Sequence, residues 1–307
     1  MEKELKVAVT ISSRLRNNND VSLQSIVNYF TFKYPGVVLR PDFFVHLNRK
    51  RCSIVNGKQS FSQDYVTNKE FEMVRNILRP KKFIIEEDYL CIKNKIKNIN
   101  ISSEDWLVNE ELNNDYQRLY ALHSQEESIR LVEEYEKENN FTYDLVFKFR
   151  PDLYVEPCAH VPREEVFSYI PKYKKLWESF NAPWSKTVDV DKLIICLDQE
   201  IMNGHLRFVD FSFFGTSKAM KLFSYKYVEN YIEYYKCLNK ERDQGNIYAD
   251  NFFTPESFMT YPITKNKMNL VSMQFFKYIL IRKNYIEGAD FETLSRLFYD
   301  HEKEEYK

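Results

Sequence analysis

Short apolar runs and longer amphipathic stretches alternate through the first half of the chain. Residues 5–12 form an apolar run rich in β-branched side chains, which predicts a strand, and a similar run predicts a second strand at about 43–47. Between them, Asp20 can cap a helix over about residues 21–33, where apolar side chains recur at helical spacing. The chain is therefore expected to begin with a strand, a helix and a strand.

The same order continues further along the chain. Thr67 and Glu70 have the spacing of a capping box ahead of a helix, and residues 82–86 then predict another strand. Residues 114–139 predict a long helix that leads directly into a buried strand at 143–149. This alternation is typical of an α/β protein with a central, mostly parallel sheet and helices on both faces.

The second half of the chain has a different pattern, with proline-rich aromatic stretches before further short elements. Asn203-Gly204 is the preferred pair for a tight hairpin turn, and we expect its strands at 192–196 and 206–209. The later expected elements are a helix capped by Thr216 through about Lys236, a helix that starts at Thr254-Pro255-Glu256, and a strand at 276–282. This half is expected to be α+β and to cover the sheet of the first half.

Length and charge narrow the class of protein. The chain has 307 residues and a formal net charge of −1, and no low-complexity linker divides it, so we expect a single folded domain over 1–307. Lysine and arginine are spread along the chain. The basic run at 93–97 is interpreted as a solvated surface segment rather than a phosphate-backbone site, and no nucleic-acid partner is predicted.

The cysteines and the N-terminus bear on the compartment. The odd number of cysteines, with no CxxC pair, fits a reduced cytoplasmic chain without structural zinc. They are Cys52, Cys91, Cys158, Cys196 and Cys237. The apolar run at the N-terminus is too short for a signal peptide or a transmembrane segment, so only peripheral contact with a membrane is expected.

A serine- and arginine-rich loop follows the first predicted strand. Ser12-Ser-Arg-Leu-Arg16 stands between that strand and the next helix, where backbone N–H groups and arginines can bind phosphate. Ser12, Ser13, Arg14 and Arg16 are therefore candidate ligand-binding residues. A solvated arginine-containing turn is the other interpretation of the same residues.

The second predicted strand carries polar residues at alternate positions. In Asp42-Phe-Phe-Val-His46, the side chains of Asp42, Phe44 and His46 are expected to share one face of the sheet. Asp42 and His46 are candidate binding residues on that face. A structural, hydrogen-bonded histidine is the alternative, and it is the commoner role for a single histidine at a strand end.

The strand at 143–149 ends in an arginine and a carboxylate. Pro151 cannot continue a central strand, so Arg150 and Asp152 are expected just beyond its carboxyl end, where open α/β sheets bind ligands. Asp152 could hold a Mg²⁺ or Mn²⁺ ion that bridges a diphosphate, because these ions take oxygen ligands. An ion pair between Arg150 and Asp152 at the rim is the alternative.

Taken in order, these patterns resemble a family of glycosyltransferase-like proteins found in bacterial surface-polysaccharide synthesis and in large DNA viruses. That family has Ser-Gly-x-Leu-Arg after its first strand, then Asp-x-Phe-x-His, then Tyr-Asp-x-Val and Arg-x-Asp after a long helix. The counterparts here are Ser12 to Arg16, Asp42 to His46 and Tyr143 to Asp152. The similarity continues through Asp210-Phe-Ser-Phe-Phe-Gly215, Met220 and Pro255-Glu256, up to about Arg282.

The resemblance implies a GT-A-like fold and a transferase that uses a nucleotide-diphosphate sugar as donor and a glycan or glycoconjugate as acceptor. It implies a nucleotide-sugar-binding half at 1–157, an acceptor-side half at 158–307, Asp152 as the ligand of Mn²⁺ or Mg²⁺, and a cytoplasmic protein, in the host if viral. Two departures stand out: Ser13 replaces the family's glycine, and Arg150 replaces the first acid of Asp-x-Asp. Either a single carboxylate suffices, or metal dependence is weak and Arg150 helps to neutralise the diphosphate.

The resemblance also brings forward two candidates for a catalytic base, Asp210 and Glu256. Phenylalanines around Asp210 would raise the pKa of its carboxyl toward a useful range. Glu256 stands at a predicted helix start, where a carboxylate is favourable without catalysis. The alternative class is a catalytically inert nucleotide-sugar-binding or scaffold protein with the same fold. A phosphotransferase is less favoured, since no GxxxxGK[ST] loop is present.

Overall fold

A computed structural model provides the structure of the protein. It describes residues 3–15, 19–31, 37–55, 58–87, 114–157, 189–197, 199–202, 205–208, 212–245, 258–272 and 276–280.

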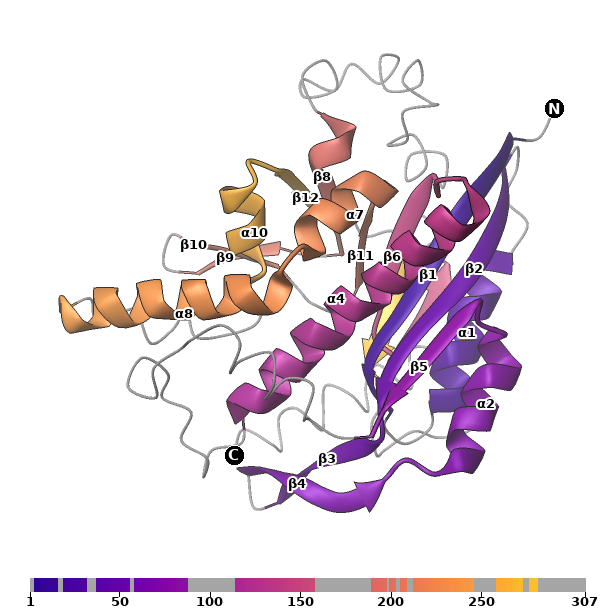
Figure 1. Ribbon diagram of the computed structural model, residues 1–307, viewed down its shortest axis with the longest axis horizontal. Coiled ribbons are helices and arrows are strands. Elements are labelled where there is room, and N and C mark those ends of the chain that lie inside the picture. The colour runs from indigo at the N-terminus through magenta and orange to yellow at the C-terminus, as the bar shows by residue number, and fades with distance from the viewer. Residues whose placement is uncertain are drawn as a thin grey trace.

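A seven-stranded sheet forms the centre of the molecule, in the order β12-β8-β11-β6-β1-β2-β5 (Figure 1). Its strands are β1 (Lys3–Arg14), β2 (Val37–Asn48), β5 (Lys82–Glu86), β6 (Leu145–Phe149), β8 (Leu193–Cys196), β11 (Ser212–Gly215) and β12 (Asn269–Ser272). All neighbouring pairs are parallel except those of β11, which is antiparallel to both β6 and β8. The predicted α/β class with a mostly parallel sheet is confirmed, and both halves of the chain supply strands to it.

Helices cover both faces of this sheet. The helices are α1 (Asn19–Thr31), α2 (Asn68–Leu78), α4 (Asn114–Asn139), α7 (Ser217–Ser224), α8 (Tyr227–Asp243) and α10 (Thr260–Lys265), with a 3₁₀ turn, η2, at Val190–Lys192. The first apolar core joins α1 and α2 to one face, and the second joins α4, α7, α8 and α10 to the other. Among the helices described, none is long and apolar enough to cross a bilayer.

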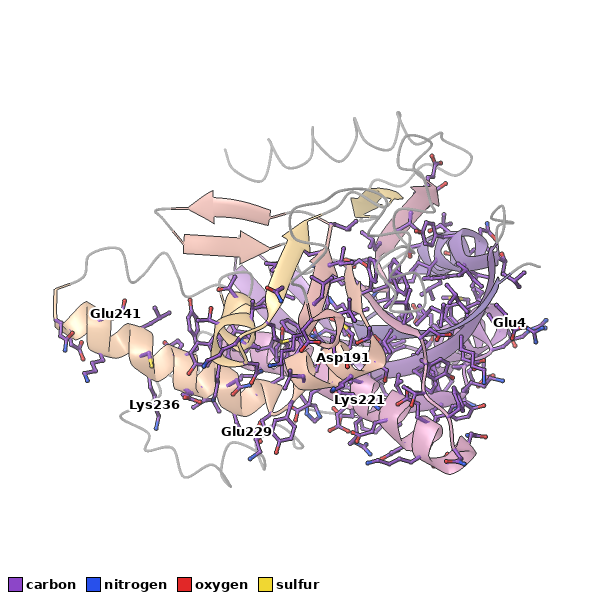
Figure 2. All side chains as sticks on the ribbon, turned by 90° about the horizontal axis from the view of Figure 1, so that it is seen from above. Glu4, Asp191, Lys221, Glu229, Lys236 and Glu241 are labelled. Atoms are coloured by element: carbon purple, nitrogen blue, oxygen red, sulfur yellow. The ribbon has the colours of Figure 1, made fainter. Side chains whose placement is uncertain are left out.

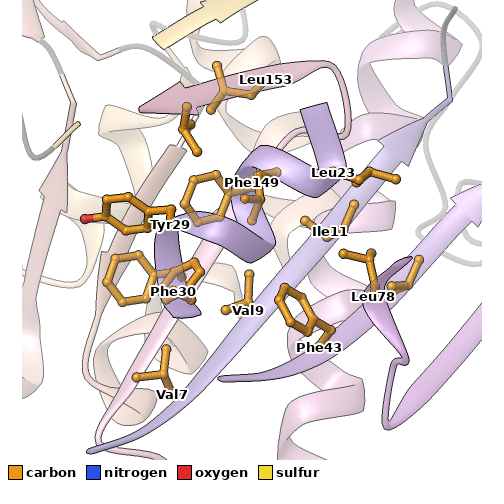
Figure 3. Packing of buried hydrophobic residues seen from close by; sticks show 14 of the residues in the cluster. Val7, Val9, Ile11, Leu23, Tyr29, Phe30, Phe43, Leu78, Phe149 and Leu153 are labelled. Carbon is orange, nitrogen blue, oxygen red and sulfur yellow. The ribbon is translucent and has the colours of Figure 1, made fainter. Parts of the chain in front are cut away.

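The two cores follow from the alternation of side chains along β1. Val7, Val9 and Ile11 are fully buried and pack with Phe30 of α1 and Phe149 of β6 (Figure 3). The intervening residues Ala8, Thr10 and Ser12 are also buried and, because successive side chains point to opposite faces, they lie on the α4 side. A central strand buried on both faces explains why its sequence reads as a continuous apolar run.

In the part of the chain that the structure describes, three small antiparallel pairs accompany the main sheet. They are β3 (Lys50–Val55) with β4 (Lys58–Tyr65), β7 (Leu153–Pro157) with β13 (Phe276–Leu280), and β9 (Gln199–Met202) with β10 (His205–Phe208). The last pair confirms a hairpin around residues 203–204, but its first strand is not the predicted one. Residues 193–196 belong to the main sheet instead, because this fully buried apolar run pairs with β11 and β12.

Helix caps are where local sequence was most informative. The Thr67 hydroxyl accepts from the Glu70 N–H at 3.3 Å, and the Glu70 carboxylate accepts from the Thr67 N–H at 2.8 Å, so the predicted capping box is present. Thr216 likewise accepts from the Ala219 N–H at 3.1 Å and starts α7.

The helix predicted from Thr216 through Lys236 is two helices. The break falls at residues 225–226, where Lys226 has a φ of 50°, a conformation that ends an α-helix. After the break, α8 runs past Glu229, Lys236 and Glu241 (Figure 2). The predicted helix start at Pro255 lies outside the described residues.

Candidate functional site

Successive strands are added to the sheet first on one side of β1 and then on the other. From β1 it passes through α1 to β2 and through α2 to β5 on one side, then returns through α4 to β6 on the other side. The carboxyl ends of β1 and β6 therefore meet at a topological switch point, where the connecting segments leave in opposite directions and where open α/β sheets bind ligands. The β1 end leads through Ser13 and Arg14, and the β6 end leads to Arg150 and Asp152.

The end of β1 has an unusual backbone. Ser13 has a φ of 112°, in the region that favours glycine, and its N–H donates to the Ser124 hydroxyl at 2.9 Å. Ser13 therefore adopts a glycine-like conformation while it carries a serine side chain. Such strain persists only where the surroundings enforce it, and it gathers at binding sites.

The neighbours of Ser13 are placed differently from one another. The Ser12 side chain is 1% exposed on the α4 side, and its hydroxyl has no hydrogen-bond partner among the described residues. The Arg14 guanidinium lies over the ring of Tyr120, 5.8 Å from its centroid. Arg16 lies outside the described residues.

At the end of β6, Arg150 and Asp152 form a two-pronged ion pair. The Arg150 Nε and an η nitrogen donate to the two carboxylate oxygens of Asp152 at 3.0 and 2.9 Å. Asp152 is 2% exposed and the Arg150 side chain 17% exposed. The ion pair that the sequence left as an alternative is thus formed, in a partly buried setting where a charge-assisted pair is strong.

Helix α1 fixes the turn that carries this pair. The Ser22 hydroxyl donates to the carbonyl of Pro151, and the Ser25 hydroxyl accepts from the N–H of Val155 at 3.0 Å. Because α1 follows directly after the loop of β1, one helix positions both edges of the switch point.

Asp42 lies away from this rim. Its carboxylate accepts from the Tyr143 hydroxyl at 2.7 Å and pairs with Lys81 at 3.4 Å, near the amino ends of β5 and β6. Burial, together with the hydrogen bond to Asp42 and its charge, raises the pKa of the Tyr143 hydroxyl far above its usual range. Asp42 precedes His46 by four residues, or about 13 Å along the strand. The structure does not bring Asp42 together with the other candidates.

His46 lies at the rim, and two residues that the sequence analysis did not select lie beside it. Glu86 ends β5 and His123 belongs to α4; the Glu86 Oε1 atom is 3.0 Å from His123 Nε2 and 3.4 Å from His46 Nε2. These three atoms lie within 4.8 Å of one another, a group that could hold a metal ion. Glu86 could have been found as the last residue of a predicted strand, but nothing in the sequence distinguishes His123 from other polar residues of its helix.

Ser124 connects this group to the switch point. Its hydroxyl donates to the His46 carbonyl at 2.8 Å, accepts from the Ser13 N–H, and lies 3.0 Å from the His46 Nδ1 atom. One α4 side chain therefore holds the ends of both β1 and β2.

The remaining predicted residues and the described cavity do not add to the site. Asp210 and Glu256 lie outside the described residues. A cavity of about 450 Å³ opens between α1, α2 and β7, with Gln24, Ile77 and Tyr154 in its lining, and none of the predicted site residues lines it.

No protein-family model and no curated protein sequence matches the chain. Several solved structures are similar. Mouse xyloside xylosyltransferase 1 in its apo form is 12% identical over 88% of this chain and 85% of its own, with a TM-score of 0.40. The galactosyltransferase LgtC, in complex with donor and acceptor sugar analogues, is 9% identical over 83% and 69%, with a TM-score of 0.34. The glycosyltransferase GlyE of Streptococcus pneumoniae is 10% identical over 86% and 45%, with a TM-score of 0.34.

Proposed function

We propose that the chain is a glycosyltransferase that binds a nucleotide-diphosphate sugar at the switch point between β1 and β6. One observation carries the proposal: the strained backbone of Ser13 lies with Arg14 and Arg150 at the carboxyl ends of the neighbouring strands β1 and β6. Open α/β sheets bind nucleotides at this place, and arginines and backbone N–H groups are the partners that phosphates take. The ordered sequence patterns that resemble the glycosyltransferase-like family support the same choice of ligand.

In this proposal arginine side chains stabilise the departing diphosphate. Arg14, Arg16 and Arg150 neutralise charge as the bond between the anomeric carbon and the diphosphate oxygen breaks. An acceptor hydroxyl forms the new bond to that carbon and gives its proton to a carboxylate. Asp210 and Glu256 are the two residues proposed for that proton transfer.

A divalent cation at Asp152 would add positive charge beside the diphosphate. The residues around Asp152 do not fit such an ion as they are arranged, because both carboxylate oxygens bind the Arg150 guanidinium, whose charge would repel it. We therefore assign Asp152 to the positioning of Arg150 and derive no step through a metal there. Without an Asp-x-Asp motif, either a single carboxylate binds the metal or the metal dependence is weak and Arg150 helps to neutralise the diphosphate. The assignment of Asp152 to Arg150 favours the second mechanism.

A catalytically inert nucleotide-sugar-binding protein is the second candidate. The observation that favours it is the same closed pair, since Asp152 is buried and already occupied. It differs from the first candidate in one respect that can be measured: it binds a donor without releasing or transferring its sugar.

Donor binding tests the proposal first. Thermal unfolding is followed with UDP-, GDP- and dTDP-sugars, with and without Mn²⁺, and with CMP-sugars as monophosphate comparators. A donor that binds only the folded state raises the Tm. We expect a shift with one diphosphate donor that survives chelation of Mn²⁺, and release of labelled sugar, not of labelled phosphoryl groups, from that donor.

Two matched variants locate the binding. Arg150→Met should lose the donor-induced shift, whereas Arg130→Met, at an exposed arginine of α4, should keep it. If no donor shifts the Tm of the native protein, or if both variants respond equally, the proposed site is wrong. A shift without sugar release would establish the inert alternative.

A further inference from the structure

His46, Glu86 and His123 converge from three elements that are distant in sequence. The residues come from the end of β2, the end of β5 and the interior of α4. The two imidazole rings are nearly perpendicular, at 88°, with centroids 5.7 Å apart, and both present Nε2 to the same carboxylate oxygen. Two histidines and one carboxylate are also the protein ligand set of many catalytic zinc sites.

The hydrogen bonds fix the state of the His46 ring. The single proton of the Ser124 hydroxyl goes to the His46 carbonyl, and one of its lone pairs accepts from the Ser13 N–H. The remaining lone pair faces His46 Nδ1, so Nδ1 carries the proton and donates. With Nδ1 donating to Ser124, the other ring nitrogen, Nε2, faces the Glu86 carboxylate at 3.4 Å, and a proton or a metal ion between these two atoms makes the contact favourable.

The two histidines of the group are largely shielded from solvent. The His46 and His123 side chains are 1% and 7% exposed, and Glu86 is 18% exposed. The His123 Nε2–H can donate to Glu86 at 3.0 Å, but the contact between His46 Nε2 and the same oxygen is costly in a buried setting unless a proton or a metal ion joins the two atoms. Glu86, the most exposed member, leaves one side of the group open.

We infer that His46, Glu86 and His123 form a binding site for a divalent transition metal of the zinc type. Ligand bonds of about 2.1 Å arranged tetrahedrally place neighbouring ligand atoms about 3.4 Å apart. The observed Glu86 separations of 3.0 and 3.4 Å are close to that spacing, and all three ligand atoms lie within 4.8 Å of one another. Imidazole ligands favour Zn²⁺ over Mg²⁺, and three protein ligands leave a position for water.

Ser124 gives the site the outer contact that metal-binding histidines usually have. A hydrogen bond to the far ring nitrogen orients the imidazole and fixes its tautomer. Here the same hydroxyl also holds the strained Ser13 amide. Metal binding at this group would therefore stabilise the end of β1, yet the site shares no ligand with the Arg150–Asp152 pair and does not depend on the proposed transferase activity.

Direct metal binding tests the inference on the full chain. Purified, chelator-treated protein is titrated with Zn²⁺ in a calorimeter, and separately with Co²⁺ and Cu²⁺ for spectroscopy. We expect one strong site per chain, a Co²⁺ spectrum typical of a low-coordinate site, and a Cu²⁺ paramagnetic resonance spectrum with coupling to two imidazole nitrogens. Mg²⁺ at the same concentration should not compete.

Matched variants assign the ligands. Glu86→Gln and His123→Asn should each weaken Zn²⁺ binding at least tenfold, whereas Glu87→Gln, at the next residue, should leave it unchanged. Ser124→Ala should weaken binding roughly 10- to 100-fold while one metal still binds. A native chain that binds no Zn²⁺, or whose Cu²⁺ spectrum shows no imidazole pair, would overturn the inference without reference to any variant. Equal affinities in Glu86→Gln and Glu87→Gln would do the same.

Discussion

The two ends of the parallel sheet use polar residues in different ways. At the amino end, near the start of β6, polar groups are paired with one another: Asp42 with Tyr143 and Lys81, and Asp144 with the N–H of Lys6 at 3.0 Å. At the carboxyl end the backbone of Ser13 is strained, and two buried histidine rings converge on the Glu86 carboxylate. The first arrangement is complete without a ligand, whereas the second has features that a bound ligand would stabilise.

The sequence patterns that resemble the glycosyltransferase-like family include residues at both ends of the sheet. Asp42, Tyr143 and Asp144 belong to those patterns, but their contacts join strands of the fold. Ser13 and Arg150 occupy positions of the same patterns, Ser13 in place of the family's glycine, and they lie at the switch point. Membership of a shared pattern therefore does not by itself indicate contact with substrate, and substitutions at the two ends should have different consequences.

The largest expected effect is at the amino end. Glu136, 3% exposed, accepts from the Tyr143 N–H and the Ser217 hydroxyl and pairs with Lys221 (labelled in Figure 2). Glu136→Ala leaves these donors without their acceptor, so we expect the free energy of unfolding to fall by about 3 kcal/mol. Urea denaturation measures this. Glu133→Ala on the same helix removes only an exposed pair with Lys137 and should cost less than about 0.5 kcal/mol.

A stabilising effect is expected at the carboxyl end. Ser13→Gly removes the cost of a φ of 112° for a side-chain-bearing residue, so stability should rise by roughly 1–2 kcal/mol. Ser13→Ala keeps a Cβ atom and should bring no gain. Thermal unfolding of the two variants side by side decides whether the strain is real, since equal Tm values would refute it.

A pH-dependent effect of about 1 kcal/mol is expected for Tyr143→Phe, which removes one hydrogen bond to Asp42. Because the pKa of Tyr143 is raised in the folded protein, its hydroxyl ionises first in the unfolded chain, at about pH 10. The native protein should therefore lose stability as pH rises above about 10, and the variant should lose less. Urea titrations at neutral pH and near about pH 10.5 provide the comparison. Parallel pH curves for the two proteins would contradict the assigned cause.

The smallest expected effect is at Ser12. Its buried hydroxyl has no partner in the described part of the chain, so Ser12→Ala should change the free energy of unfolding by less than about 0.5 kcal/mol. If the hydroxyl contacts a donor, the same variant should weaken donor binding. Chemical denaturation and donor titration on one preparation separate the two. A large loss of stability would show that Ser12 has a structural role, like the polar residues at the amino end of the sheet.

Local signals predicted much of the fold. The strand at 82–86, the helix at 114–139 and the capping box at Thr67 follow from periodicity and capping alone. The antiparallel insertion of β11 was not predicted, because four buried residues carry no mark of strand direction. The break before α8 was not predicted, because Lys226 adopts a positive φ and a lysine in the sequence does not indicate that conformation.

The candidate site was harder to predict from the sequence than the fold, because part of it depends on contacts between distant segments. Arg150 and Asp152 were found because two neighbouring residues at a strand end suffice to suggest a rim. The group of His46, Glu86 and His123 required knowing that β5 lies beside β2 and that α4 packs over both. No spacing within the sequence encodes that convergence, so it emerged only from the three-dimensional arrangement.

Helix α4 touches both ends of the sheet, and this limits how the chain can evolve. His123 and Ser124 contact the carboxyl end, while Glu136 contacts the amino end about 20 Å further along the helix axis. One inserted or deleted residue between them would rotate one set of side chains by about 100° relative to the other. The span from His123 to Glu136 should therefore be inherited without gaps in descendants of the chain.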